Sequence, residues 1–203
     1  MKSVIRLGLI LMLFTAAAAG LLAFTNEATK GRIAEQERAA QEAALTLAMP
    51  AATSFDPADD LLASYREAGQ FPRVQSIWIG RANGQAVGLV VKVTPVGYGG
   101  PVIALVGIGS DGRSTGMTII NAAQETPGLG ANILHEWFQK QFVGKEATRD
   151  LVVVKRPPQA NNEVQAITAA TISSNAVTDG VNEAFDLWAS LWPRVSEGEV
   201  SGQ

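Results

Sequence analysis

The chain has 203 residues, of which 47% are hydrophobic and 17% charged, and its net charge at pH 7 is −3. So much apolar material predicts a chain that folds around a core rather than a disordered one. The absence of cysteine excludes disulfides, thiolate-held iron–sulfur clusters and a cysteine nucleophile. The single histidine, His135, argues against a protein-only zinc site and bis-histidine haem. The sequence has no basic patch of the kind that would indicate a nucleic-acid partner.

An uncharged apolar run from Leu7 to Phe24 predicts a transmembrane helix over residues 7–25. About 20 apolar residues are enough to cross a hydrocarbon core of roughly 30 Å. Lys2 and Arg6 precede the run without any acidic residue, so the positive-inside rule leaves residues 1–6 in the cytoplasm. The rest of the chain is then expected on the other side of the membrane.

A cleaved signal peptide is the alternative interpretation of this run. The small residues from Ala16 to Gly20 are of the kind that signal peptidase accepts. The apolar run, however, continues through Leu21, Leu22 and Phe24, where a signal peptide turns polar. This continuation favours an uncleaved anchor.

Residues 26–72 are predicted to be a helical, membrane-proximal stalk. Thr29–Met49 is rich in Ala, Glu, Gln and Arg, a composition that favours helix, with only a thin apolar stripe. The stripe suits either a spacer above the bilayer or a packing surface for a membrane partner, and both interpretations stay open. Asp56 as N-cap and Pro57 as first helical residue predict a second short helix that ends at Gly69.

From Val74 onward the pattern is typical of strands. Gln75–Ala82 and Gln85–Thr94 flank Asn83-Gly84, a strong signal for a type I′ hairpin turn. A second predicted hairpin follows, made of Pro101–Gly109 and Ser114–Asn121 around Asp111-Gly112. Four strands in series predict an antiparallel meander.

The remaining chain supplies helices for this sheet. Asn132 is predicted to cap a helix whose apolar face comprises Ile133, Leu134, Trp137, Phe138 and Phe142. Leu151–Val154 is a predicted fifth strand, and Ser174–Leu191 a last helix with Val177, Val181, Ala184, Phe185, Trp188 and Leu191 on its buried face. The expected fold is α+β, an antiparallel sheet with flanking helices over residues 73–193, followed by a polar tail at 194–203.

Two segments have a composition that suggests a binding site. Gln124–Ala131 contains two glycines that permit close backbone approach to a ligand, although local chemistry alone favours an ordinary turn. Ile167–Asn175 places four hydroxyls at the start of a helix, where free N–H groups and the helix dipole favour an anion. Ala169 and Ala170 leave room beside Thr171, so a phosphate site is plausible. The alternative is that one serine or threonine simply caps the helix.

Other common sites do not fit the sequence. It contains no Gly-x-Ser-x-Gly elbow and no P-loop. Gly107, Gly109 and Gly112 fall in a predicted hairpin, whereas a dinucleotide fingerprint needs a strand-to-helix turn. His135 lies among apolar residues of a predicted helix, and we interpret it as a packed or surface residue rather than a base.

The order of these motifs behind one N-terminal span resembles a known family. It is the covalent FMN-binding domain of the G subunit of the Rnf (Rsx) electron transport complex, shared with the C subunit of the sodium-translocating NADH:quinone reductase. The matching pieces are Gly97–Pro101, Val106–Ile108, Asp111-Gly112, Glu125–Gly130 and Thr168–Ser174. The Glu-Thr-Pro-Gly-Leu-Gly string is the most specific. Length favours the Rnf protein, because its counterpart in the quinone reductase is generally longer.

The resemblance implies a flavin site. In this family a separate flavin transferase links FMN through its phosphate to the last threonine of the second motif, which is Thr171 here. Hydroxyls of that motif are expected to donate to the phosphate, and we expect the Glu125–Gly130 loop to pack near the flavin. The cofactor-binding residues expected on this basis are Thr171, Thr168, Ala170, Ser173, Ser174, Glu125, Thr126, Leu129 and Gly130.

The sequence departs from the family pattern at three places. Ala169 stands where glycine is usual, which is a small change unless the position requires a positive φ. Gln165 stands where the transferase motif usually has Asp, an acid that we expect to help present the loop to the enzyme. Ala122–Gln124 replaces a common His-Lys pair.

The implied function is that of a single-pass inner-membrane flavoprotein with a periplasmic FMN domain. It would relay electrons inside a multi-subunit complex that exchanges electrons between ferredoxin and NAD and moves sodium ions or protons, and it would not be a catalyst by itself. Its partners would be the other subunits, the membrane and a flavin transferase. The alternative is a scaffold subunit that is never flavinylated, which the departures at Gln165 and Ala169 favour. Bound flavin discriminates between the two.

Overall fold

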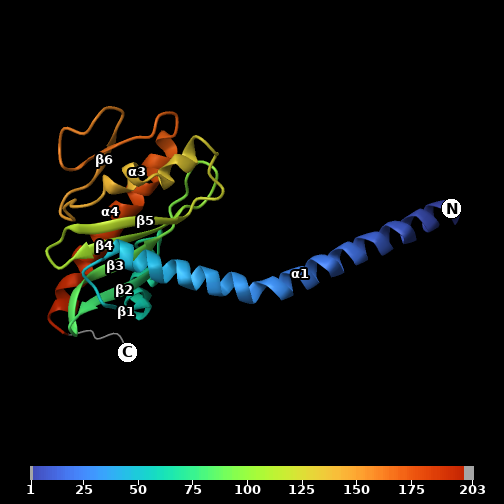
Figure 1. The fold of residues 1–203 in the computed structure, drawn as a ribbon, viewed down its shortest axis with the longest axis horizontal. Coiled ribbons are helices and arrows are strands. Elements are labelled where there is room, and N and C mark those ends of the chain that lie inside the picture. The colour runs from blue at the N-terminus through green and yellow to red at the C-terminus, as the bar shows by residue number, and fades with distance from the viewer. Residues whose placement is uncertain (1, 199–203) are drawn as a thin grey trace. The chain divides into compact units, whose positions relative to one another are not determined.

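The computed structural model of the chain describes residues 2–198 and divides into two compact units, residues 1–41 and 42–203 (Figure 1). Of the predicted polar tail, residues 199–203 lie outside the described residues. The first unit belongs to one continuous helix, α1 (Lys2–Ala48), of 47 residues. It contains an 18-residue window of mean hydropathy 2.3 in which no residue is buried, so its length and composition make it a candidate membrane span.

The second unit is built on a five-stranded antiparallel sheet in the order β1-β2-β3-β4-β5. The strands are β1 (Ser54–Pro57), β2 (Val74–Ala82), β3 (Gln85–Val93), β4 (Ile103–Gly109) and β5 (Ser114–Asn121). The four-stranded meander predicted from the sequence is therefore confirmed, with β1 added at its edge.

The two hairpin turns differ from each other. Asn83 and Gly84 both have positive φ, 52° and 79°, as a type I′ turn requires. In the second hairpin only Gly112 has a positive φ, and the Gly109 N–H donates to the Arg113 carbonyl oxygen at 2.8 Å. The expected two-residue turn is thus wrong, because the loop has three residues and uses its glycine in the left-handed position.

The helix predicted to begin at Asp56 is also wrong. Residues 54–57 form the edge strand β1, and the Asp56 carboxylate pairs with Arg81 of β2 at 2.5 Å instead of capping a helix. A 3₁₀ helix (Asp59–Leu62) and the short α2 (Ala63–Glu67) follow, and Gly69 with φ 67° ends them. Pairing with β2 overrides the local helix signal.

Alternate residues of the sheet face two different cores. On one face Ile77, Ile79 and their neighbours pack under the long helix α4 (Thr171–Ser196). On the other face a smaller cluster joins the end of α1 to the sheet; it comprises Ala44, Leu45, Ala48, Met49, Ala52, Trp78, Val90 and Leu105. The last part of the predicted stalk is therefore a packed element of the globular unit.

The end of α1 rests on four glycines, one on each of the strands β2 to β5. A Cβ on Gly80 or Gly88 would overlap the Met49 side chain, and a Cβ on Gly107 or Gly116 would overlap the Ala48 carbonyl. The Thr115 hydroxyl also donates to the Ala48 carbonyl oxygen at 2.6 Å. We call Gly80, Gly88, Gly107 and Gly116 the helix seat.

The helix expected from Asn132 is broken into two pieces. A 3₁₀ helix (Gly130–Leu134) and α3 (Glu136–Lys140) are separated by His135, which is extended and exposed. Ile133, Phe138 and Phe142 are buried as predicted, but Leu134 and Trp137 are 44% and 47% exposed because the break changes the phase of the apolar face. The Asn132 side chain donates to the Gly128 carbonyl oxygen and caps nothing.

Near the C-terminus the structure adds one strand and lengthens the last helix. The predicted fifth strand, β6 (Val152–Val154), pairs in parallel with β7 (Glu163–Gln165), which the sequence did not predict. Helix α4 begins at Thr171 and continues past Pro193 to Ser196, with Val195 buried. Pro193 has no N–H to donate to the Ala189 carbonyl oxygen, but the helix continues for three more residues after it.

Candidate functional site

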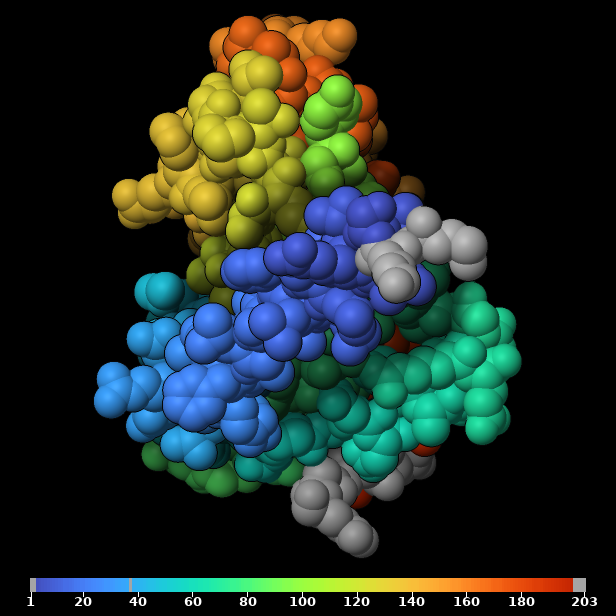
Figure 2. Space-filling view, turned by 90° about the vertical axis from the view of Figure 1, so that its right-hand side faces the viewer, coloured from blue at the N-terminus to red at the C-terminus, as the bar shows by residue number. Residues whose placement is uncertain are grey.

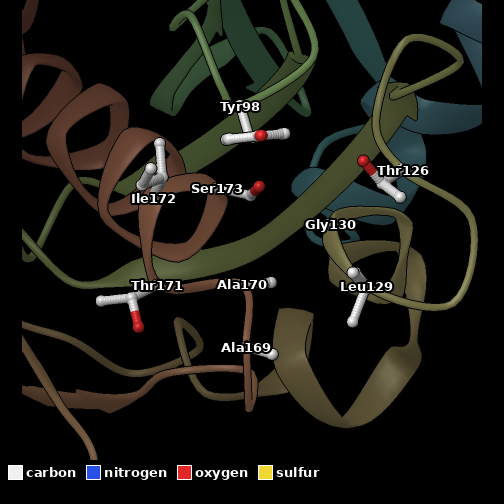
Figure 3. A pocket seen from close by; sticks show the side chains of 9 residues that line it. All are labelled: Tyr98, Thr126, Leu129, Gly130, Ala169, Ala170, Thr171, Ile172 and Ser173. Carbon is white, nitrogen blue, oxygen red and sulfur yellow. The ribbon is translucent and has the colours of Figure 1, made fainter.

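A pocket of about 500 Å³ lies where three loops meet at one end of the globular unit. Figure 2 shows these regions gathered together, in light green near residue 98, yellow near residue 130 and orange near residue 170. The pocket is lined by Tyr98, Thr126, Leu129, Gly130, Ala169, Ala170, Thr171, Ile172 and Ser173 (Figure 3). The two segments singled out in the sequence thus form one cavity, although they lie far apart along the chain.

Six of the nine expected site residues line this pocket: Thr126, Leu129, Gly130, Ala170, Thr171 and Ser173. Three do not. Thr168 is exposed outside the lining, and Glu125 is buried behind it. Ser174 is also fully buried; its hydroxyl accepts from the Ile167 N–H and donates to the Ala170 carbonyl oxygen, both at 3.0 Å. Ser174 therefore holds the backbone turn and does not face a ligand.

Three residues line the pocket without having been among the expected cofactor-binding residues: Tyr98, Ala169 and Ile172. The sequence did contain a signal for Tyr98, since three glycines and a proline surround it. Tyr98 is 69% exposed, and Leu129 and Ile172 are 43% and 56% exposed. Such exposed apolar side chains around one cavity indicate a surface that an apolar ligand or a partner covers.

The start of α4 supplies the polar end of the pocket. The residue at the N-cap is Ala170, with no side-chain capping bond, so the alternative in which a serine or threonine caps this helix is not found. Within residues 2–198 the amides of Thr171, Ile172 and Ser173 have no hydrogen-bond acceptor. Free amides at the start of a 26-residue helix favour an anion.

Ala169 adopts a left-handed backbone conformation, with φ 62°. Glycine is usual at this position in the family that the sequence resembles. The change to alanine matters here, because the backbone has a positive φ. A residue with a Cβ pays about 1–2 kcal/mol in this region. The turn that presents Thr171 is therefore strained.

We expect Ala169→Gly to stabilise the protein by about 1 kcal/mol, because glycine adopts a positive φ without steric cost. Urea unfolding in detergent, followed by tryptophan fluorescence, measures the change. Ala170→Gly is the matched control, because Ala170 has φ −131° and the glycine there only adds chain entropy to the unfolded state. Equal losses of stability in both variants would contradict the strain at Ala169.

The segment that leads into this turn is held by side chains. The Gln165 backbone N–H, in β7, donates to the side-chain amide oxygen of Gln141 at 2.7 Å. The side-chain amide nitrogen of Gln141 donates in turn to the Gln165 carbonyl oxygen at 3.2 Å. Arg156 and two backbone amides lower the pKa of Glu163 to about 2, so this carboxylate is charged at neutral pH. Burial lowers the pKa of Lys145, whose ammonium donates to the carbonyls of Asn161 and Glu163. Gln165 itself does not line the pocket.

Comparison with known proteins decides the family. Residues 97–186 match the FMN-binding domain and residues 1–47 match the RnfG N-terminal region. The G subunit of the Na(+)-translocating ferredoxin:NAD(+) oxidoreductase complex of Acetobacterium woodii is 43% identical, over 94% of each chain. The chain belongs to the RnfG family, the G subunits of ion-translocating oxidoreductase complexes.

Other relatives of this RnfG-family chain are more distant. The G subunit of the ion-translocating oxidoreductase complex of Methanosarcina acetivorans is 34% identical, over 91% of this chain and 94% of that one. The crystal structure of Shewanella oneidensis NqrC aligns with a TM-score of 0.49 and 18% identity, over 58% of this chain and 60% of that chain.

All residues that line the pocket fall inside the matched FMN-binding domain. The volume of the pocket lies within the range of small-molecule sites, roughly 300–1,000 Å³. The pocket fits FMN in chemistry, because the apolar side chains of Tyr98, Leu129 and Ile172 suit a ring system and the free amides beside Thr171 suit a phosphate. The chain thus carries an FMN-binding domain, and α1 is its candidate anchor in the membrane.

Proposed function

We propose that this protein relays electrons within its complex through an FMN that is covalently attached to Thr171. The observation that carries the proposal is the position of Thr171: it is the first residue of α4, it lines the pocket, and the helix amides around it are free. A hydroxyl at this place can become a phosphate ester whose negative charge lies on the helix N-terminus.

In the attachment step the Thr171 hydroxyl oxygen attacks the phosphorus on the FMN side of a flavin dinucleotide. A new P–O bond forms, and the bond to the bridging oxygen breaks. The mononucleotide leaves with the electron pair, and a base of the flavin transferase takes the hydroxyl proton. The chain contributes the exposed turn and the free amides, while the transferase supplies catalysis.

Once bound, FMN supplies the capacity to accept and donate electrons. The chain's own residues would orient it: the amides of Thr171–Ser173 would hold the phosphate, and Tyr98 and Leu129 would contact the ring. The exposed rim leaves the ring accessible to another protein of the complex, as an electron relay requires.

Mass spectrometry tests the attachment. The intact protein, produced with a flavin transferase and its own complex, is expected to be heavier by one FMN less one water. Peptide mapping should place the added mass on Thr171. An unmodified protein would instead support the scaffold interpretation, in which the domain only binds its neighbours in the complex.

We also propose that the N-terminus of α1 lies in the cytoplasm and the FMN domain in the periplasm, because Lys2 and Arg6 flank the apolar run. The absence of cysteine permits a clean test. An impermeant maleimide should label Glu197→Cys in cells with a permeabilised outer membrane, and should label Ser3→Cys only after lysis. The opposite labelling pattern would reverse the topology.

A further inference from the structure

The side chain of Glu125 connects the three walls of the pocket without lining it. It is only 4% exposed. One carboxylate oxygen accepts the Tyr98 N–H at 2.8 Å and, at 3.5 Å, the Gly99 N–H. The other oxygen accepts the Ser173 hydroxyl at 2.8 Å. One side chain therefore joins its own loop to the loop of Tyr98 and to the first turn of α4.

The surrounding backbone is shaped around this carboxylate. A Cβ on Gly97 or on Gly130 would overlap the Glu125 carboxylate, and the one on Gly130 would also come within 2.9 Å of the Ser173 hydroxyl oxygen. A Cβ on Gly99 would overlap the Gln124 carbonyl just before it. Glycine at these positions lets three backbone segments close on a single buried acid.

The hydrogen-bond partners of Glu125 are all neutral donors, two backbone amides and one hydroxyl. A buried carboxylate that accepts several N–H and O–H bonds needs all of them, since each unmade bond leaves a desolvated polar group. The same holds for the donors. The Tyr98 loop and the beginning of α4 are consequently fixed with respect to each other through Glu125.

We propose that Glu125 is a positioning residue for the pocket. Its carboxylate holds Tyr98, the exposed aromatic wall, at a set place opposite the residues of α4 that line the cavity. It also places one negative charge directly behind Gly130 and Ser173. The positioning role concerns the chain alone; its effect on a bound flavin rests on the proposed function.

Amide hydrogen exchange on the flavin-free protein tests the positioning directly. Glu125→Ala should speed exchange at the Tyr98 and Gly99 amides about tenfold, because a hydrogen bond to a charged acceptor is lost. Ser173→Ala should speed it less, since Glu125 keeps its backbone partners. Glu146→Gln is the matched control, because Glu146 pairs with Arg113 away from the pocket and its side chain is 45% exposed. Unchanged exchange in Glu125→Ala would overturn the proposal.

A second readout uses the flavinylated protein. Glu125→Gln keeps the shape of the side chain but removes its charge, so the flavin potential should rise and the quenching of flavin fluorescence by Tyr98 should weaken. Glu125→Asp, which keeps the charge, should restore the potential in part. A potential that is equal in Glu125→Gln, Glu125→Asp and the parent would overturn the electrostatic role. If the parent carries no flavin, the proposed function fails while the exchange experiment still decides the role of Glu125.

Discussion

We expect Thr171→Ala to abolish the covalent flavin attachment proposed above and to leave the domain folded. The physical reason is that the hydroxyl is the only part of the side chain that can form the phosphate ester, whereas the side chain is only partly buried. Alanine is also a good residue for the first turn of a helix. The expected readouts are complete loss of the FMN mass, an unchanged circular dichroism spectrum and a melting temperature within a few degrees of the parent protein.

Two variants make this outcome specific. Thr171→Ser keeps a hydroxyl at the same place and should retain covalent flavin, at a reduced yield. Ser190→Ala removes a hydroxyl from the exposed face of the same helix, where it donates to the Asp186 carbonyl oxygen, and should leave flavinylation unchanged. If Thr171→Ala still gained the flavin mass, another hydroxyl would be the acceptor and the proposed site would be wrong.

The sheet and one half of the site could be predicted because their signals are local. The strands of the meander are runs of apolar and β-branched residues that are buried on both faces, and Asn83-Gly84 specifies its turn through the backbone of two residues. The crowding of small and hydroxyl residues around Thr171 likewise lies within one short segment. Such patterns can be interpreted without knowing the tertiary structure. They predict the strands of the meander, the last helix and the end of the pocket that suits a phosphate.

The other half of the site depends on contacts between distant segments. Glu125 bonds to Tyr98, 27 positions away in the sequence, and to Ser173, 48 positions away. The residues near Glu125 in the sequence therefore do not show whether its carboxylate positions other loops or contacts a ligand. The edge strand at Asp56 was missed for the same reason, because its partner in β2 lies far along the chain, with Asp56 and Arg81 separated by 25 positions. The strain at Ala169 became visible only with the backbone angle.

The second large effect concerns the helix seat rather than the pocket. In Gly107→Ala the new Cβ meets the carbonyl carbon and oxygen of Ala48, which are backbone atoms and cannot rotate away. The end of α1 must then lift from the sheet, which exposes the cluster around Leu45 and breaks the bond from Thr115. Overpacking of this kind costs about 3 kcal/mol. For a unit of this size that lowers the melting temperature by roughly 6–12 °C.

Two other glycine variants separate this clash from a general effect of alanine. In Gly80→Ala the nearest atom is the sulfur of Met49, the far part of a flexible side chain that can move, so the loss should be smaller than in Gly107→Ala. In Gly31→Ala nothing lies within 4 Å, and alanine should stabilise α1 by up to about 1 kcal/mol. Thermal unfolding in detergent should therefore rank the melting temperatures Gly31→Ala, Gly80→Ala, Gly107→Ala from highest to lowest. A Gly107→Ala protein as stable as Gly31→Ala would mean that the end of α1 does not rest on the sheet, and that the membrane-proximal segment is a free stalk after all.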